Sequence, residues 1–414
     1  MAPSVTMARR CIFALCASAF FILVHADDSD LSDFSNNLAT DIGPLLVLFS
    51  DSMTKQYLSE STFFLDYFIF AIAPISILTA IVSAIQVCGH SSLRAFIGRS
   101  QEGDGAVEAE LCTSTSRDVC ELFNQGGITR VMGKPDILEL IYLPETRSFE
   151  LFRDYLDKRG NSEDSNSWWQ REGGRFSRPG GETRDKVSFA PNPNLSLNVG
   201  IAKRPAWVLY AIAATGCVLQ ACVLALAGAG VWILGWNLNG SESSSSASRD
   251  YAPIMFITGT VLMYSGMWSC AALIGQTTHE VRFRRARKPR DHDAKPPRLV
   301  WLQPGPQVIG DQSFDPFAYF ENTAANPLPE WTSSRKDFDE KFETYTFAAV
   351  LAVLIGYIMQ FIGLRGMKAW VSLAQLGATV VMSILRGCIR MQRLGRNDNR
   401  LLAMPDMVSG YELD

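Results

Sequence analysis

The sequence predicts a predominantly α-helical integral membrane protein, with about five transmembrane helices after a signal peptide and a small cytosolic α+β unit built from two loops. Hydrophobic residues make up 47% of the 414 residues and charged residues only 19%, below the usual quarter. The hydrophobic residues are concentrated in a few long runs, and basic residues flank most of those runs. The net charge of −4 gives no indication of nucleic-acid binding, and nine irregularly spaced cysteines do not make a disulfide framework.

Residues 1–26 have the pattern of a secretory signal peptide. Two arginines precede an apolar run at 11–24, which is too short to span a bilayer comfortably, and the small residue Ala26 suits cleavage. The alternative is an uncleaved signal anchor, and either form directs the chain to the endoplasmic reticulum. Residues 27–66 then follow as a lumenal or extracellular segment. Within it, 42–58 are expected to form a helix that either lies along the membrane or packs as an ordinary helix leading into the first span.

Five apolar segments approach the roughly 20 residues that a transmembrane helix needs. They are 67–87, 206–236, 253–274, 346–364 and 369–385. The first contains Pro74, which a membrane helix tolerates where neighbouring helices satisfy the freed backbone groups. The last two are joined only by the sequence RGMK and should form a tight helical hairpin. Aromatic residues near the segment ends fit the belts found at membrane interfaces: Trp207, Trp236, Tyr345 and Trp370.

The distribution of lysine and arginine predicts how the spans are oriented. The parts expected to be lumenal or extracellular, 27–66, 237–252 and 365–368, hold few basic residues. The remaining parts, 88–205, 275–345 and the C-terminal tail 386–414, are rich in them and are predicted to be cytosolic. We expect the chain in the plasma membrane or an endomembrane of the secretory pathway, with its N-terminus lumenal or extracellular.

Two glycosylation sequons offer a check on this orientation. Asn239 begins a sequon in a predicted lumenal loop, so we expect Asn239 to be glycosylated. Asn194 begins another in a predicted cytosolic loop and should stay unmodified.

Cys112 and Cys120 lie eight residues apart in the first predicted cytosolic loop. The stretch 115–126, which contains Cys120, predicts a helix, because Thr115 and Asp118 resemble a capping box. The reducing cytosol argues against a disulfide between the two cysteines, and the lack of a nearby histidine or second cysteine pair argues against zinc. We therefore expect both thiols to be buried as small apolar side chains.

The rest of the cytosolic unit is predicted from strand patterns in both loops. Residues 128–132 and 136–143 flank a Gly-Lys-Pro turn and predict a pair of strands. Further segments are assigned by composition: 194–202 and 298–320 as strands, 159–186 as disordered, and 333–346 as a helix that enters the fourth span.

No residue pattern indicates a catalytic residue, a cofactor site or a metal site. The sequence has no zinc-protease, P-loop or nucleophile-elbow motif, and its four histidines are scattered. The predicted spans carry ionisable residues only at their ends, whereas coupled transporters place them inside. Gln360 and Gln375 are expected to face each other across the last hairpin and hold its helices together. Small residues should let helices approach closely: Gly228, Gly230, Gly259 and Gly266.

Three blocks of sequence resemble a large set of filamentous-fungal multi-span membrane proteins. They are residues 78–140, which contain CTSTSRDVCELFNQGGITRVMGKPDILEL, the segment GPQVIGDQSFDPFAYF at 305–320, and residues 353–387 with VLIGYIMQFIGLRGMKAW. The blocks occur in the same order and spacing as in that family, which is of unknown function. Many of its members carry C-terminal ankyrin repeats, which this sequence lacks. The resemblance implies a multi-span membrane protein and supplies no catalytic residues.

These observations favour a non-enzymatic multi-pass membrane protein that acts as a scaffold or sensor-like component through its cytosolic unit. Its expected partners are the lipid bilayer and other proteins on the cytosolic face, with no nucleic acid and no cofactor. A transporter or channel component is the alternative. A membrane accessory factor or enzyme in fungal secondary metabolism is a further one.

Overall fold

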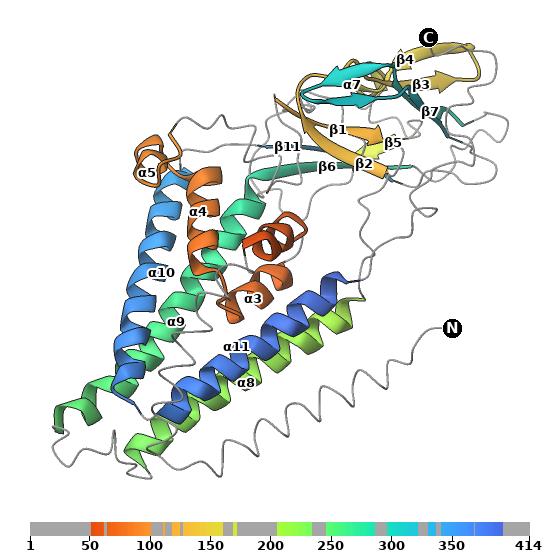
Figure 1. Ribbon diagram of the computed structural model, residues 1–414. Helices are drawn as coiled ribbons and strands as arrows, with labels where there is room; N and C mark the ends of the chain where they lie inside the picture. Colours follow the sequence, from red (N-terminus) through yellow and green to blue (C-terminus); the bar gives the residue numbers. More distant parts are fainter. Residues whose placement is uncertain are drawn as a thin grey trace. The chain divides into compact units, whose positions relative to one another are not determined.

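The computed structural model divides the chain into two compact units. Unit 1 comprises 1–85, 204–273 and 340–391, and unit 2 comprises 86–203, 274–339 and 392–414. The described residues are 51–61, 64–100, 111, 118–124, 127–159, 169–171, 205–233, 246–285, 296–321, 330–336, 341–367 and 369–391. Unit 1 is helical and unit 2 consists mainly of strands (Figure 1). The expected signal peptide at 1–26 and the sequon at Asn239 lie outside the described residues.

Unit 1 contains four helices that are long and apolar enough to cross a membrane. They are α8 (Ala206–Trp232), α9 (Ser246–Gln276), α10 (Lys341–Arg365) and α11 (Ala369–Arg390). About 20 residues of helix cover the roughly 30 Å of a hydrocarbon core, and each of the four reaches that length. The four later spans of the sequence analysis are therefore confirmed as helices of spanning length.

The first expected span is not a single helix. It is divided into α3 (Phe64–Ile72) and α4 (Ile77–Cys88), drawn as separate helices in Figure 1. Pro74 lies in the break, where it has no N–H to donate and disfavours helix at the residue before it. Ser76 then takes a positive φ of 65°, which a continuous helix does not allow. The twelve residues of α4 rise only about 18 Å, short of a full crossing.

Helices α9 and α10 pack with their backbones in direct contact. A Cβ atom added to Gly356 or Gly363 of α10 would lie closer than 3.0 Å to backbone atoms of α9. The same holds in reverse for Gly259 and Gly266 of α9, which meet the backbone of α10. Rising residue numbers on α9 meet falling numbers on α10, so the two helices are antiparallel. Small residues permit this approach in membrane helices, as the sequence predicts for Gly259 and Gly266.

Unit 2 is built from antiparallel strands of both predicted cytosolic loops. The four-stranded sheet has the order β10 (Phe317–Phe320), β7 (Arg298–Gln303), β3 (Leu138–Leu143), β4 (Ser148–Leu151). A second sheet has the order β11 (Glu330–Lys336), β6 (Thr278–Arg285), β5 (Trp169–Arg171). Because β3 and β7 are paired, the two loops share one sheet. The cytosolic location of the unit stays a prediction.

Two hairpins and two short helices complete unit 2. The hairpins are β1 (Val119–Asn124) with β2 (Gly127–Met132), and β8 (Gln307–Ile309) with β9 (Gln312–Phe314). The helices are α5 (Ser91–Phe96) and α7 (Phe152–Arg159). Phe152, Trp301 and Trp331 are among the largest side chains of the shared hydrophobic core.

Side-chain amides attach both hairpins to neighbouring segments. The buried Gln303 accepts a hydrogen bond from the Phe123 N–H at 2.9 Å and donates one to the Phe123 carbonyl at 3.0 Å. Gln303 therefore pairs with β1 as a neighbouring strand residue would. Gln307 makes the same two contacts with the backbone of Asp136, at 2.9 and 3.0 Å.

Several local predictions in unit 2 are wrong. The expected helix at 115–126 is the strand β1 where it is described, with Cys120 and Leu122 buried and Glu121 paired across the hairpin with Arg130. The segments 128–132 and 136–143 do not pair with each other, because β2 pairs with β1 while β3 pairs with β4 and β7.

The assignments by composition have mixed outcomes. Within 298–320, the strands β7 to β10 are present as expected. The expected helix at 333–346 begins only at Lys341, because β11 continues to Lys336. The expected strand 194–202 lies outside the described residues, as does most of 159–186. The described parts of 159–186 are not disordered, because Arg159 ends α7 and 169–171 form β5.

Candidate functional site

Buried glutamines connect the helices of unit 1. Gln360 donates to the Thr260 hydroxyl at 3.0 Å, and Gln375 donates to the Tyr264 hydroxyl at 2.9 Å. Both partners are on α9, so the expectation that Gln360 and Gln375 face each other is wrong, although each does join two helices. Gln220 of α8 donates to the Ile72 carbonyl at 3.3 Å, at the break between α3 and α4. This bond satisfies a backbone group near Pro74, as a membrane interior requires.

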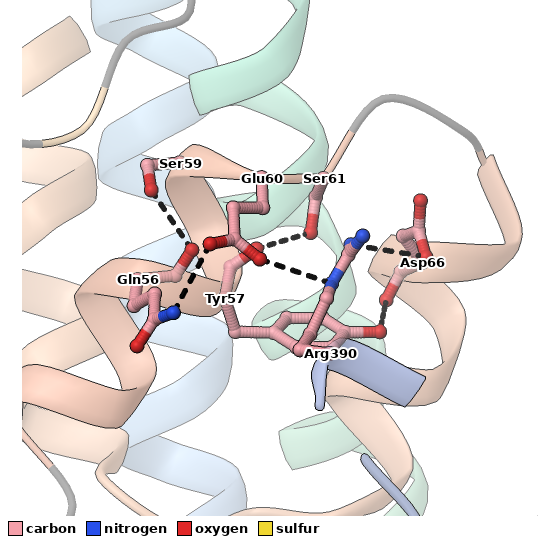
Figure 2. A network of polar contacts seen from close by, with 7 residues as sticks. All are labelled: Gln56, Tyr57, Ser59, Glu60, Ser61, Asp66 and Arg390. Carbon is pink, nitrogen blue, oxygen red and sulfur yellow. Dashed lines mark hydrogen bonds and ion pairs between the residues drawn. The ribbon is translucent and has the colours of Figure 1, made fainter. Parts of the chain in front are cut away.

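The buried charges of unit 1 are gathered at one end of its helices. Among the described residues of this unit, Asp66 and Arg386 are the charged side chains that are buried, at 2% and 3% exposed. They lie in a cluster formed by the helical residues 51–59, α3 and the last turns of α11. Figure 2 shows Asp66 in this cluster beside Arg390. Burial of charge is costly unless it is compensated, so this cluster is the strongest candidate for a functional site in the bundle.

Arg390 is the centre of the ion pairs in the cluster. Its Nη2 lies 3.3 Å from Asp66 Oδ1, and its Nε lies 3.7 Å from Glu60 Oε2. Its guanidinium also lies over the ring of Tyr57, 4.8 Å from the centroid. The Tyr57 hydroxyl donates to the backbone carbonyl of Asp66 at 3.2 Å, as Figure 2 shows. Burial, with Asp66 as a second cause, raises the pKa of Tyr57 above its ordinary value, so the phenol stays protonated and donates.

Arg386 lies one turn before Arg390 on the same face of α11. Its guanidinium lies beside two stacked aromatic rings, 5.4 Å from the centroid of Tyr57 and 5.3 Å from that of Phe70. Its Nη1 is buried and has no hydrogen-bond partner among the described residues. Arg386 therefore differs from Arg390, because no described carboxylate is paired with it.

A small hollow opens beside the two arginines. Its volume is about 200 Å³, and it is lined by Met53, Gln56, Tyr57, Arg386, Gly387, Arg390 and Met391. The described lining has two guanidinium groups and no carboxylate. Such a surface suits the binding of an anion, because guanidinium groups match planar or tetrahedral oxyanions. In the described part of the chain, no group of three or more histidine, cysteine, aspartate or glutamate side chains could hold a metal ion.

The cluster does not fit the expected first crossing. The sequence analysis places Asp66 before the first span and Arg390 after the last, on opposite sides of the membrane. Their contact at 3.3 Å places both residues at the same end of the bundle. The reason is the break at Pro74, because neither α3 nor α4 alone is long enough for the expected first crossing.

Sequence reasoning missed this cluster, because Arg386 and Arg390 have the pattern of an ordinary basic flank after the last span. The signal that could identify them is the spacing of two arginines by four residues, which directs both to one helix face. The predicted glycosylation site Asn239 and Cys112, the first cysteine of the pair 112/120, lie outside the described residues. Cys120 is a buried free thiol on β1, as expected.

A second candidate lies on the four-stranded sheet of unit 2. One face of the sheet packs on α7 through buried side chains such as Ile141 and Leu143. The opposite face, here called the outer face, carries Leu138, Leu140, Tyr142, Phe149, Leu151, Arg298, Val300, Leu302, Ala318 and Phe320. Val300 and Ala318 are buried, and the exposed apolar part of the face lies on β3 and β4. Leu138 and Leu151 are 46% and 44% exposed. Large apolar side chains gathered on one exposed face are characteristic of protein interaction sites.

No protein-family model, curated protein or solved structure matches this chain. The resemblance to fungal multi-span membrane proteins therefore stays a prediction from the sequence.

Proposed function

We propose that this chain is a non-enzymatic integral membrane protein that acts as a scaffold or sensor-like component, binding another protein through unit 2. The observation that supports this proposal is the outer face of the four-stranded sheet. Four long apolar helices suggest a membrane protein, and the loops between and before them form a separate folded unit.

The outer face has the composition expected of a binding surface. Tyr142 is close to Phe149 and Phe320, with ring centroids 5.0 and 6.4 Å apart, and Arg298 lies over the Phe320 ring at 5.7 Å. Aromatic side chains and arginine are enriched at the centre of protein interfaces. β4 is at an end of the strand order, so its exposed Leu151 adjoins a sheet edge that could accept a partner strand. We expect the partner to offer an apolar segment.

The experiment compares charged substitutions on and off the outer face, in the full chain expressed in membranes. Leu138→Lys and Leu151→Lys should remove a protein that copurifies in mild detergent with the wild type. Val308→Lys is the matched control, because Val308 is a 73% exposed apolar residue on β8, outside the outer face. A partner retained by all variants, or lost equally with Val308→Lys, would refute the proposed role of this surface.

A further inference from the structure

Arg386 is a buried positive charge without a described anion beside it. Of the two arginines in the cluster, Arg390 has both nearby carboxylates, Glu60 and Asp66. Arg386 has the faces of two rings, and its Nη1 is buried without a hydrogen-bond partner among the described residues. Ring faces attract a cation weakly compared with an oxyanion that accepts two hydrogen bonds. A negatively charged acceptor would satisfy both the charge of Arg386 and its unpartnered Nη1.

The hollow places such an acceptor within reach of both arginines. Arg386 and Arg390 line it together with Gln56, whose amide can also donate. A Cβ atom added to Gly387, between the arginines in sequence, would meet nothing within 4 Å. The space above this glycine is therefore open, and the guanidinium forks beside it match the oxygens of a phosphate group.

The position of the hollow suits the phosphate of a lipid. Arg386 and Arg390 are in the last turns of a helix of spanning length, where hydrocarbon gives way to headgroups. Met53 and Met391 form an exposed apolar rim, which could contact the glycerol and upper acyl chain. We propose that this hollow is a phosphate-binding site, occupied by the headgroup phosphate of an anionic phospholipid or by a soluble phosphate. The inference goes beyond the proposed function, because it concerns unit 1 and does not depend on a protein partner.

The test is native mass spectrometry of the full chain in detergent, titrated with three probes: phosphatidic acid, phosphatidylcholine and inorganic phosphate. For wild type we expect one tightly bound phosphatidic acid and weaker phosphatidylcholine. Arg386→Gln should weaken phosphatidic acid binding about tenfold or more, as expected for the loss of a charge-assisted hydrogen bond. Arg365→Gln is the matched control, because Arg365 also ends a spanning helix and lies over a ring, that of Phe361, but is exposed.

A second pair of variants keeps every charge. Gly387→Leu adds an apolar side chain at the lining of the hollow, where an added Cβ meets nothing within 4 Å, and Gly377→Leu adds the same side chain to the same helix where the added Cβ also meets nothing within 4 Å. Neither change removes a stabilising contact, so both proteins should fold. We expect Gly387→Leu to lose phosphatidic acid binding and Gly377→Leu to keep it.

The probes separate the source of the phosphate. If inorganic phosphate competes fully with phosphatidic acid, the site binds a soluble phosphate. If phosphatidic acid binding does not change when inorganic phosphate is added, the site binds the headgroup of a lipid. Equal binding of phosphatidic acid and phosphatidylcholine in all variants overturns the inference. The inference is also overturned if Gly377→Leu or Arg365→Gln weakens binding as much as its partner variant.

Discussion

Replacing Gly356 with alanine should destabilise unit 1 more than its single added methyl group suggests. The new Cβ would lie closer than 3.0 Å to the backbone N of Met263, whereas ordinary contacts begin near 3.4 Å. Backbone atoms cannot rotate away, so α9 and α10 would have to separate by roughly 0.5 Å or more, which weakens dispersion contacts along the whole interface. From the usual cost of overpacking, we expect the free energy of unfolding to fall by about 1–3 kcal/mol.

Two other glycines provide a graded comparison. At Gly216 an added Cβ meets the flexible end of Met382, which can move, and Ile72 Cγ2 at 3.1 Å, which must shift only slightly, so Gly216→Ala should cost about 1 kcal/mol, less than Gly356→Ala. At Gly377 it meets nothing within 4 Å, so Gly377→Ala should leave stability unchanged or raise it slightly by improving helix propensity.

The assay is thermal unfolding of the full chain in detergent, followed by tryptophan fluorescence and by loss of helical circular dichroism. The expected order of melting temperature is Gly377→Ala highest, Gly216→Ala intermediate and Gly356→Ala lowest. If Gly356→Ala melts with Gly377→Ala, the backbone contact between α9 and α10 is not present and the assigned antiparallel register is wrong. A separate measurement of a Thr260–Gln360 double-mutant cycle would then show whether that interhelical bond is also absent.

Three further predictions concern other parts of the chain. Gln303→Ala should destabilise unit 2 by about 1–3 kcal/mol by leaving the backbone of Phe123 unpaired, and hydrogen exchange of β1 should accelerate while that of β4 does not. Burial, and then Glu121, raises the pKa of Cys120 to about 12, so alkylation of the native protein at pH 8 should spare this thiol and modify it only after unfolding. The folded state holds the Cys120 proton more tightly than the unfolded state does. The contribution of this proton to the free energy of unfolding is therefore complete below the ordinary pKa of 9.0, and it is lost as pH rises from 9.0 to about 12. If Asn239, between α8 and α9, is lumenal as the sequence predicts, an endoglycosidase should shift the mobility of wild type and not of Asn239→Gln. Because Asp66 and Arg390 lie at one end of the bundle, this result would place Asp66 on the cytosolic side, and modification of Asn194 instead would place it on the lumenal side.

The long apolar helices could be predicted from the sequence because their signal is local. A run of about 20 apolar residues has few other stable forms in a membrane, and α8, α9, α10 and α11 all begin or end within a few residues of expectation where the ends are described. Pro74 could be identified in the sequence as a position where a helix can be disturbed, but whether the helix ends there depends on packing. A proline in a membrane helix can kink or end it, and here Ser76 and the bond from Gln220 favour the end.

The predictions in unit 2 were wrong where local and distant contacts compete. Residues 119–124 have polar and apolar residues that suit either a helix or a strand, and pairing with β2 decides for a strand. The partners of β3 include β7, which comes from the other loop, far along the chain, and no local pattern can identify it. The candidate site was missed for the same reason, because Glu60 and Asp66 meet Arg390 only after the chain has crossed the bundle several times.

The touching backbones of α9 and α10 have a mechanical consequence. Two helices whose backbones touch at several glycines resist sliding, because each glycine would meet a larger neighbour after one turn, so the pair is expected to move as a single stiff unit. Contacts of α8 with α11 and α3 pass through deformable side chains, including Met382 and Leu209. Any rearrangement within the bundle is therefore expected as a shear of α3, α8 and α11 against that pair, which would carry Arg386 and the hollow along with it.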